Sequence, residues 1–519
     1  MKRALAGSWL VATLAALVIY VPTNDHFYRI AAGRQIARYN EMPFRDFLDP
    51  GMLGTEWLSA VVQLVFGDHL LGEILLNVAC IGAGATLVLV LAHRLSSSWL
   101  IAGAAALSAL ALRPRAYDYD KFLLYPLGIW LCCRYYDRQR VRDLALLAAC
   151  IVIAASVRYD NGLFIAVAAV AGMASKDGVG RGGFWRNLGM LAGLTAAIAL
   201  PILLVVGLSG GIADAFDQVA TYAAREGART RMLRLPSLPL GEGVTADTVA
   251  GVFGYLFLVL PLAASVQLAI WPPNRPTPHM WTAIALCLLL DAFILRDPLS
   301  ARIGGIAGPP AVIAAFLAAP LARFTRPLLI GVALVLGVAC AFVVKEVDVK
   351  SVLARHSPGR AIAALEARAS SPVPLDHLPA QLTGIVAYVR ECSSTADRLL
   401  LTWFAPEVYF FAQRGFAGGV GVLFGEHWSE RRFQQRIVTT LETESVPLVI
   451  GHDNRGERPF NVVYPIVNTY LTEHYDLAGT TSFSDTESAP GSYQVLVKKG
   501  VKVERRWAGS NLPCLTSNY

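Results

Sequence analysis

Residues 21–57 read VPTNDHFYRIAAGRQIARYNEMPFRDFLDPGMLGTEW, a polar stretch that follows the first apolar run of the chain and precedes many more. Its charged side chains include Asp25, Asp46, Asp49, Glu56, Arg29, Arg34, Arg38 and Arg45. Ionisable groups are costly inside lipid, so a segment with this much mixed charge belongs at a membrane surface. The stretch is therefore the first place to look for chemistry.

The composition indicates a membrane protein. The chain has 519 residues, 55% of them hydrophobic and only 16% charged, and its mean hydropathy is +0.48. Apolar runs recur along the first two thirds of the sequence, and such runs are typical of helices that cross a bilayer. We predict about eleven spans, at 4–21, 70–92, 98–112, 122–133, 144–157, 161–175, 188–208, 249–271, 280–295, 303–322 and 328–344.

The domain organisation follows from these runs. Residues 1–344 form the predicted transmembrane module, with a first outward loop at 22–69 and a long outward loop at 209–248. The run from Trp57 to Phe66 is too short to span a bilayer and predicts an interfacial helix. Lysine and arginine are enriched in the loops that lie on the same side of the membrane as the N-terminus. This enrichment predicts a cytoplasmic N-terminus and an extracytoplasmic tail. The expected location is the bacterial cytoplasmic membrane.

The tail changes character after a proline-containing linker at 345–384. Residues 385–519 predict strands at LLLTWF, GGVGVLF, VPLVIGHD and SYQVLVKK, alternating with helices near 406–414, 429–444 and 460–474. Such alternation is typical of a small α/β domain. The glycine-rich GFAGGVGVLFG fits neither of the common phosphate-binding spacings, and we interpret it as a strand and turn.

Two cysteines stand apart from the others. Cys392 and Cys514 are the only cysteines in the predicted outward domain, which they bracket. Their spacing and neighbours do not resemble a zinc site, so we predict a disulfide between them and no metal ligands. The net charge of +7 lies in loops without a basic, aromatic-interleaved patch, which argues against nucleic-acid binding.

Further charged residues lie in the other outward loops. RPRAYDYDKF contains Asp118, Asp120 and Lys121, and alternation along an extended turn would place the two carboxylates together. They can act on a sugar, a phosphate or a cation, or they can simply neutralise neighbouring charges at the interface. The residue pattern leaves both roles open.

A second group of charges lies at membrane depth. SVRYDNG contains Arg158 and Asp160 between two apolar runs, where they either form a structural ion pair or bind a ligand. Arg296 and Arg302, in ILRDPLSARIGG, are predicted on the same side. Guanidinium groups there suit a lipid phosphate, although each can also serve as an interfacial anchor.

The layout resembles the GT-C superfamily of polytopic glycosyltransferases, which includes protein O-mannosyltransferases, aminoarabinose transferases of lipid A and mycobacterial arabinofuranosyltransferases. The resemblance is carried by NDHFYRIAAGRQI after the first helix, then by PFRDFLDPG and TEWLSA, many spans and an outward α/β tail. It implies transfer of a sugar from a polyprenyl-phosphate donor to an extracytoplasmic glycan, lipid or protein. It also implies a catalytic acid in the first outward loop, which maps to Asp25, and a second acid at Asp118 or Asp120.

Such a transfer needs few protein groups. An inverting transfer needs one carboxylate to take the acceptor's proton and cations to stabilise the departing phosphate, with or without a divalent metal such as Mg²⁺ or Mn²⁺. The alternative is a transporter or flippase of a lipid-linked or polar substrate, although the chain shows no internal symmetry of the kind many transporters have. Asp25 also has a structural alternative, as the N-cap of a helix through residues 27–39.

Overall fold

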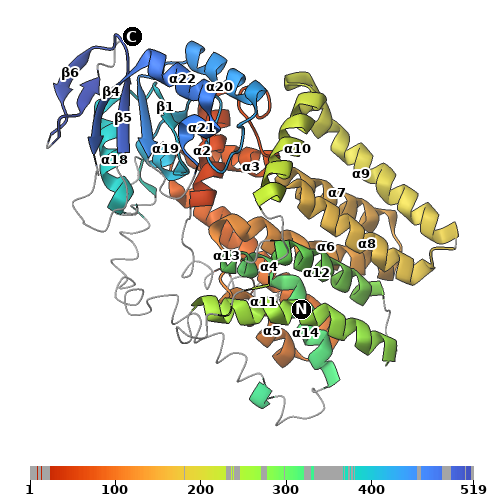
Figure 1. Ribbon diagram of the computed structural model, residues 1–519. Coiled ribbons are helices and arrows are strands. Elements are labelled where there is room, and N and C mark those ends of the chain that lie inside the picture. The colour runs from red at the N-terminus through yellow and green to blue at the C-terminus, as the bar shows by residue number, and fades with distance from the viewer. Residues whose placement is uncertain are drawn as a thin grey trace. The chain divides into compact units, whose positions relative to one another are not determined.

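The computed structural model describes residues 24–180, 182–229, 246–270, 278–296, 299–320, 380–452, 458–481, 493–508 and 510–515, with a few single positions outside these ranges. The described chain is mostly helical and divides into two compact units (Figure 1). Unit 1 comprises Met1–Pro22, Ile74–Val205 and Thr230–Ala361, and unit 2 comprises Thr23–Glu73, Val206–Arg229 and Ile362–Tyr519.

This division corrects the predicted domain boundaries. The sequence assigned the first outward loop and the long loop to the transmembrane module of residues 1–344. In the structure, the first loop and helix α10 (Ile212–Arg229) form one compact unit with the C-terminal tail. The cause is long-range pairing between polar segments, which a residue-by-residue hydropathy pattern does not contain.

Unit 1 is built from helices. They are α4 (Leu70–Ser96, which starts in unit 2), α5 (Trp99–Ala111), the short 3₁₀ helix η1 (Ala116–Asp118), α6 (Tyr119–Arg138), α7 (Val141–Val157), α8 (Tyr159–Asp177), α9 (Gly182–Ser209), α11 (Ala246–Ile270), α12 (Pro278–Arg296), α13 (Ser300–Ile306) and α14 (Gly308–Ala318).

Fewer helices are suited to crossing a membrane than the sequence predicted. By length and composition, four described helices qualify: Leu70–Ser96, Gly182–Ser209, Thr248–Ile270 and Pro278–Arg296. The prediction of about eleven was therefore too high by this criterion. Helices α5, α7 and α14 have 13, 17 and 11 residues, which is short of a full crossing. The predicted spans at 4–21 and 328–344 lie almost wholly outside the described residues.

The predicted span at 303–322 is interrupted. It is divided between α13 and α14, which begins with Pro309 and Pro310 near its N-terminus. Proline has no backbone N–H and is tolerated in the first turn of a helix, so the pair begins a new helix and does not continue the previous one.

Unit 2 is an α/β unit. Its five-stranded sheet has the order β2-β1-β3-β5-β4, with β1 parallel to β2 and β3, and with β5 antiparallel to β3 and β4. The strands are β1 (Arg398–Leu401), β2 (Gly415–Phe416), β3 (Leu448–His452), β4 (Tyr475–Thr481) and β5 (Tyr493–Lys498), and β6 (Val503–Arg506) pairs with β7 (Pro513–Leu515) in a separate ribbon.

Helices cover the sheet. The tail contributes α18 (Ala380–Cys392), α19 (Pro406–Ala412), α20 (Arg431–Thr443), α21 (Phe460–Val463) and α22 (Pro465–His474). Leu400 of β1 and Val449 of β3 belong to one apolar core with Ile437 of α20 and Val467 of α22. The predicted α/β class of the tail is therefore present, with an additional strand, β4, and the β6–β7 ribbon that the sequence pattern did not indicate.

The first loop folds as two helices, α2 (Asn24–Tyr39) and α3 (Leu53–Phe66), that pack against each other. The second contains the predicted interfacial segment at 57–66. Val61, Leu64, Val65 and Phe66 remain exposed near its C-terminal end, only a few residues before α4 begins at Leu70. An exposed apolar helix end that leads directly into a candidate span suits a membrane surface.

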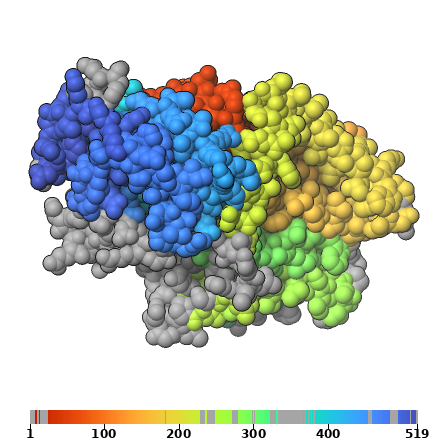
Figure 2. All heavy atoms as spheres, turned by 45° about the horizontal axis from the view of Figure 1, so that its top comes forward, coloured from red at the N-terminus to blue at the C-terminus, as the bar shows by residue number. Residues whose placement is uncertain are grey.

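Helix α10 joins the tail through ion pairs. Arg225 binds Glu430 at 2.7 Å, Arg432 binds Asp217 at 2.8 Å, and the Tyr222 ring stacks on His427 with centroids 4.4 Å apart. Figure 2 shows the yellow-green surface of α10 directly against the light-blue surface of the tail. Each exposed pair contributes little by itself, but several on one face fix the position of the helix.

The glycine-rich segment is a docking turn, and GGVGVLF is not a strand. The strand there is the two-residue β2, which ends before Gly418. Gly418 and Gly419 have φ angles of +69° and +59°, which glycine adopts without strain. Leu48 N–H donates to the Gly419 carbonyl at 2.8 Å. The glycines therefore let the tail approach the backbone of the first loop.

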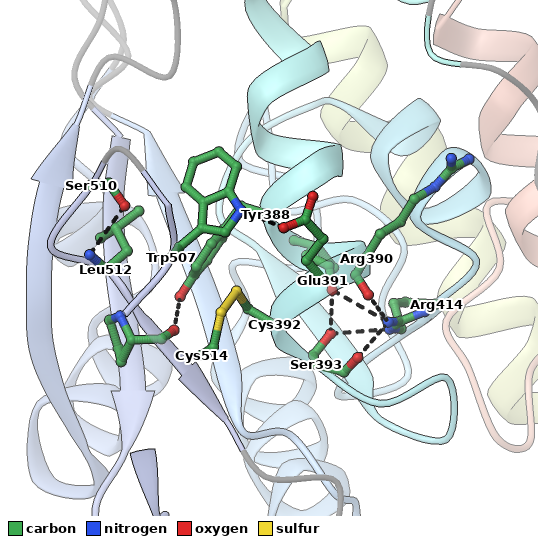
Figure 3. The surroundings of a disulfide bond; sticks show 12 residues. Tyr388, Arg390, Glu391, Cys392, Ser393, Arg414, Trp507, Ser510, Leu512 and Cys514 are labelled. Carbon is green, nitrogen blue, oxygen red and sulfur yellow. Dashed lines mark hydrogen bonds between the residues drawn. A yellow bond between two sulfur atoms is a disulfide. The ribbon is translucent and has the colours of Figure 1, made fainter. Parts of the chain in front are cut away.

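Cys392, at the end of α18, and Cys514, in β7, are joined by a disulfide (Figure 3). Around it, the Tyr388 hydroxyl donates to the Pro513 carbonyl at 2.8 Å, and the Trp507 indole donates to Glu391 at 2.9 Å. The bridge closes a loop across 122 residues. Cross-links over long loops stabilise a fold by ~2–5 kcal/mol, chiefly by restricting the unfolded chain.

The docking turn generates a stability prediction. We expect Gly419→Ala to destabilise unit 2 by at least ~1 kcal/mol more than Gly500→Ala, because tight contacts add to the backbone cost. Both glycines have positive φ. A Cβ at Gly419 would lie 2.5 Å from the Asp46 carbonyl oxygen, whereas a Cβ at Gly500 would meet nothing within 4 Å. Thermal unfolding of the two purified variants tests this, and equal losses would contradict it.

Candidate functional site

Three arginines converge on one phenylalanine ring in unit 1. Phe293, in α12, is buried. The guanidinium carbons of Arg158, Arg296 and Arg302 lie 5.3, 5.1 and 4.8 Å from the centroid of its ring. A cation at this distance is attracted by the negative face of an aromatic ring. Arg158, Arg296, Arg302 and Phe293 are called the basic cluster below.

The backbone places each arginine of the basic cluster at a helix end. Arg158 is the single residue between α7 and α8, where its extended conformation (φ −165°, ψ 128°) breaks the helix. Arg296 is the last residue of α12, and Arg302 lies in the short α13. A long charged side chain at a helix end can extend out of an apolar layer. Here the ends of three helices bring the three guanidinium groups together.

The local charges are three guanidinium groups and one carboxylate. Arg158 Nε lies 3.0 Å from Asp160 Oδ1, so the ion pair considered from the sequence is present. Arg296 Nε is buried and has no hydrogen-bond partner among the described residues. Like charges repel one another, and an anion placed among guanidinium groups relieves that repulsion through charge-assisted hydrogen bonds.

The acidic residues of the neighbouring loop lie close by. Lys121 Nζ binds Asp118 Oδ1 at 2.7 Å, and both residues are buried. Asp120 Oδ1 accepts the backbone N–H of Lys121 at 2.7 Å. The predicted extended turn is wrong, because η1 ends at Asp118 and α6 starts at Tyr119. Asp118 and Asp120 are therefore not aligned by strand alternation, and Asp118 serves an ion pair.

Glycines connect this loop to the basic cluster. A Cβ on Gly305 would lie 2.5 Å from Asp118 Cγ, and a Cβ on Gly304 would lie 2.5 Å from the Leu112 carbonyl oxygen. Helix α13, which carries Arg302, therefore packs directly on residues 112–118. The Tyr125 hydroxyl, which donates to Asn161 at 2.6 Å, lies within electrostatic reach of both the acidic loop and the Arg158–Asp160 pair.

An apolar cavity of about 260 Å³ lies in the same unit, lined by α5, α11 and α14. Its walls include Ile101, Phe253, Phe257, Leu260, Leu112 and Ala307. The last two residues adjoin the region where α13 packs on residues 112–118. An apolar cavity in the unit that also holds the basic cluster suits an amphiphile with an apolar chain and an anionic head.

Asp25 lies in unit 2, in the first turn of α2, and its side chain is exposed. The helix starts at Asn24, so Asp25 is inside the first turn and is not the N-cap. A carboxylate in the first turn interacts favourably with the helix dipole, by ~0.3–1 kcal/mol. That structural role is modest.

Two other acids of the first loop are buried together. Asp49 accepts backbone N–H groups from Gly51 at 2.6 Å and Met52 at 2.8 Å. Burial raises the pKa of Glu56 well above its usual range, and the neighbouring Asp49 raises it further. Asp49 and Glu56 are fully buried, so they are not placed to meet a substrate.

Two residues that matter to these sites carried no signal that the sequence analysis used. Phe293 is one phenylalanine among 22, and only the convergence of three arginines singles it out. Glu407, in the segment WFAPEVYFF, lies within electrostatic reach of Asp25. A glutamate directly after a proline between two apolar stretches is a weak sequence signal, because Pro-Glu also starts ordinary helices.

The described residues hold no group of three or more His, Cys, Asp or Glu side chains placed to bind a metal ion. No protein-family model and no curated protein sequence matches this chain.

The buried acids generate a pH prediction. The unfolded chain loses the Glu56 proton near its ordinary pKa, whereas the folded chain keeps it to higher pH, so stability falls as pH rises through that window. We expect Glu56→Gln to remove part of this fall. Unfolding temperatures across a pH series measure it, with Glu442→Gln as the control because Glu442 is exposed in the same unit. Parallel pH curves for Glu56→Gln and the parent would contradict the assignment.

Proposed function

We propose that this protein is an integral membrane glycosyltransferase that moves a sugar from a polyprenyl-phosphate donor to an extracytoplasmic glycan, lipid or protein. The observation that carries the proposal is the basic cluster, in the same unit as an apolar cavity. An apolar lining suits part of a prenyl chain, and guanidinium groups suit the phosphate that leaves in the transfer. The resemblance of the loop sequences to the GT-C superfamily supports the same activity.

The proposed reaction is an inverting substitution. The acceptor oxygen forms a bond to the anomeric carbon as the bond from that carbon to the phosphate oxygen breaks, and the electron pair leaves with the phosphate. Asp25 takes the hydroxyl proton of the acceptor and later releases it to water. The guanidinium groups of Arg158, Arg296 and Arg302 stabilise the charge that develops on the phosphate.

The location and sidedness belong to this proposal. The protein lies in the bacterial cytoplasmic membrane, with the N-terminus inside and the C-terminal domain outside, because the loop charges follow the positive-inside rule. Helices beyond the four that qualify by length and composition complete the membrane module. A flippase for a lipid-linked substrate needs the same apolar cavity and cations, and it is distinguished by moving the labelled lipid without cleaving it.

The basic cluster gives the first functional prediction. We expect Arg296→Gln to raise the KM for the donor by ~10–100-fold, the loss expected for one hydrogen bond to a charged group. Arg296→Lys keeps the charge and should restore part of the affinity. Arg142→Gln, at an exposed position in α7, is the matched control. The measurement is transfer of radiolabelled sugar from a panel of polyprenyl-phosphate sugars, and an unchanged KM in Arg296→Gln would remove the arginine from the donor site.

Asp25 gives the second functional prediction. We expect Asp25→Asn to lower the transfer rate by ~10²–10⁴ while the protein still folds, because asparagine fills the same space but cannot accept the proton. Asp46→Asn changes a carboxylate of the same loop that is already paired with Arg45 at 2.6 Å, and it should keep nearly the parent rate. If Asp25→Asn transfers sugar at a rate close to that of the parent, another acid must be the base.

A further inference from the structure

Asn161 is a buried asparagine whose amide nitrogen is unsatisfied. It lies in the first turn of α8 and is 2% exposed. Its Oδ1 atom accepts the Tyr125 hydroxyl at 2.6 Å, whereas Nδ2 is buried and has no hydrogen-bond partner among the described residues. Asn187, another buried asparagine of unit 1, instead donates from Nδ2 to Asp177 at 2.9 Å. Because a buried donor without an acceptor is costly, the amide of Asn161 needs an explanation other than packing.

The neighbours of Asn161 fix its position. A Cβ on Gly162 would lie 2.5 Å from the Ala155 Cβ atom and 2.7 Å from the Ala155 backbone nitrogen, so the first turn of α8 lies directly on α7. The backbone N–H of Asn161 donates to the Arg158 carbonyl at 3.0 Å. The hydrogen bond from Tyr125, in α6, sets which way the side-chain amide faces. The unpaired N–H groups are therefore held in place before a ligand binds, and such preorganisation favours selective binding.

Charged groups of both signs lie near this amide. Asn161 directly follows Asp160, which pairs with Arg158 of the basic cluster at 3.0 Å. The hydroxyl of Tyr125, which binds Asn161, lies within electrostatic reach of that ion pair and of the acidic residues at 118–120. All of these residues belong to unit 1. A neutral hydrogen-bond donor is therefore buried in the same region as guanidinium groups and carboxylates.

The chemistry of a polyprenyl-phosphate sugar matches this set of groups. Its phosphate is anionic, and the sugar bonded to that phosphate carries neutral hydroxyl groups. Guanidinium groups suit the phosphate, because charge-assisted hydrogen bonds are the stronger kind. A neutral amide N–H suits a hydroxyl oxygen. A buried site that binds a hydroxyl group discriminates strongly against ligands that lack it, because the polar atom of the site is then left unpaired.

We propose that Asn161 is a specificity-determining residue of the donor site, whose Nδ2 atom donates a hydrogen bond to a hydroxyl group of the sugar beside the phosphate. The inference rests on the proposed function and deepens it, since it assigns recognition of the phosphate and recognition of the sugar to different residues of unit 1. Asn161 makes and breaks no covalent bond. Loss of its amide should therefore matter only when the lipid carries a sugar.

Binding of two lipids to the purified full-length protein separates these roles. The probes are polyprenyl phosphate and the polyprenyl-phosphate sugar that the parent binds best in a panel, each measured as an equilibrium Kd. We expect Asn161→Leu to weaken binding of the sugar-bearing lipid ~3–10-fold, the loss expected for one hydrogen bond between uncharged groups. Its binding of polyprenyl phosphate should stay near that of the parent, which also shows that the variant folds. Arg296→Gln should weaken binding of both lipids.

Asn187→Leu is the matched control. It removes a buried amide that already has a protein acceptor, so it should not change the ratio of the two Kd values. An equal loss of affinity for both lipids in Asn161→Leu would overturn the inference, because the amide would then serve packing or the phosphate. An unchanged affinity for the sugar-bearing lipid would overturn it as well.

A second measurement needs only the parent protein. In a series of donors that each lack one sugar hydroxyl, we expect one member to bind the parent ~3–10-fold more weakly than the complete donor. Equal binding of every member would overturn the inference. In Asn161→Leu, that member should bind as well as the complete donor, because the missing hydroxyl no longer has a partner to lose.

Binding and transfer are scored separately. If the parent transfers sugar but Asn161→Leu shows no loss that depends on the sugar, the inference falls and the proposed function stands. If the loss depends on the sugar but the parent transfers none from any donor, the inference stands and the proposed function falls. A parent that binds neither lipid would overturn both.

Discussion

The buried guanidinium group of Arg34 is the interaction on which unit 2 depends. It is 1% exposed and donates to the carbonyls of Tyr409 and Phe410 at 2.8 and 3.1 Å and to Asp68 at 2.5 Å. A buried cation is tolerated only when it is well paired, and here the partners come from both ends of the sequence. The first loop and the tail therefore depend on each other. Without the tail, the Arg34 guanidinium group would lose its carbonyl acceptors, and without the first loop, the Tyr409 and Phe410 carbonyls would lose this donor.

The sequence predicted local structure better than long-range partnership. Apolar periodicity placed most of the helices of unit 1, and the tail was correctly assigned to the α/β class. The pattern did not reveal that Gly418 and Gly419 serve a backbone approach between segments hundreds of residues apart. It also overestimated the spans, because apolar runs such as 98–112 and 303–322 form helices too short to cross lipid.

The candidate site was predictable in its charges and not in its geometry. Arg158, Arg296 and Arg302 were recognisable because ionisable residues beside apolar runs are unusual. Their common partner, Phe293, was not, since one aromatic residue in an apolar helix has no distinguishing sequence context. Glu407 was missed for a related reason: only its burial and its unpartnered Oε2 atom distinguish it from an ordinary residue in the first turn of a helix.

The interruption between α13 and α14 explains how the helix that carries Arg302 comes to lie on a residue of the cavity wall. A continuous helix through 300–318 would carry Arg302 on a regular face with all of its backbone groups internally bonded. The prolines at 309 and 310 divide it, and Gly304 and Gly305 let the first piece lie directly on residues 112–118. Irregular backbone in a membrane protein is tolerated where other protein groups or a cavity satisfy it. The break therefore lets α13, which carries Arg302, lie on residues 112–118, and Leu112 of that segment also lines the apolar cavity.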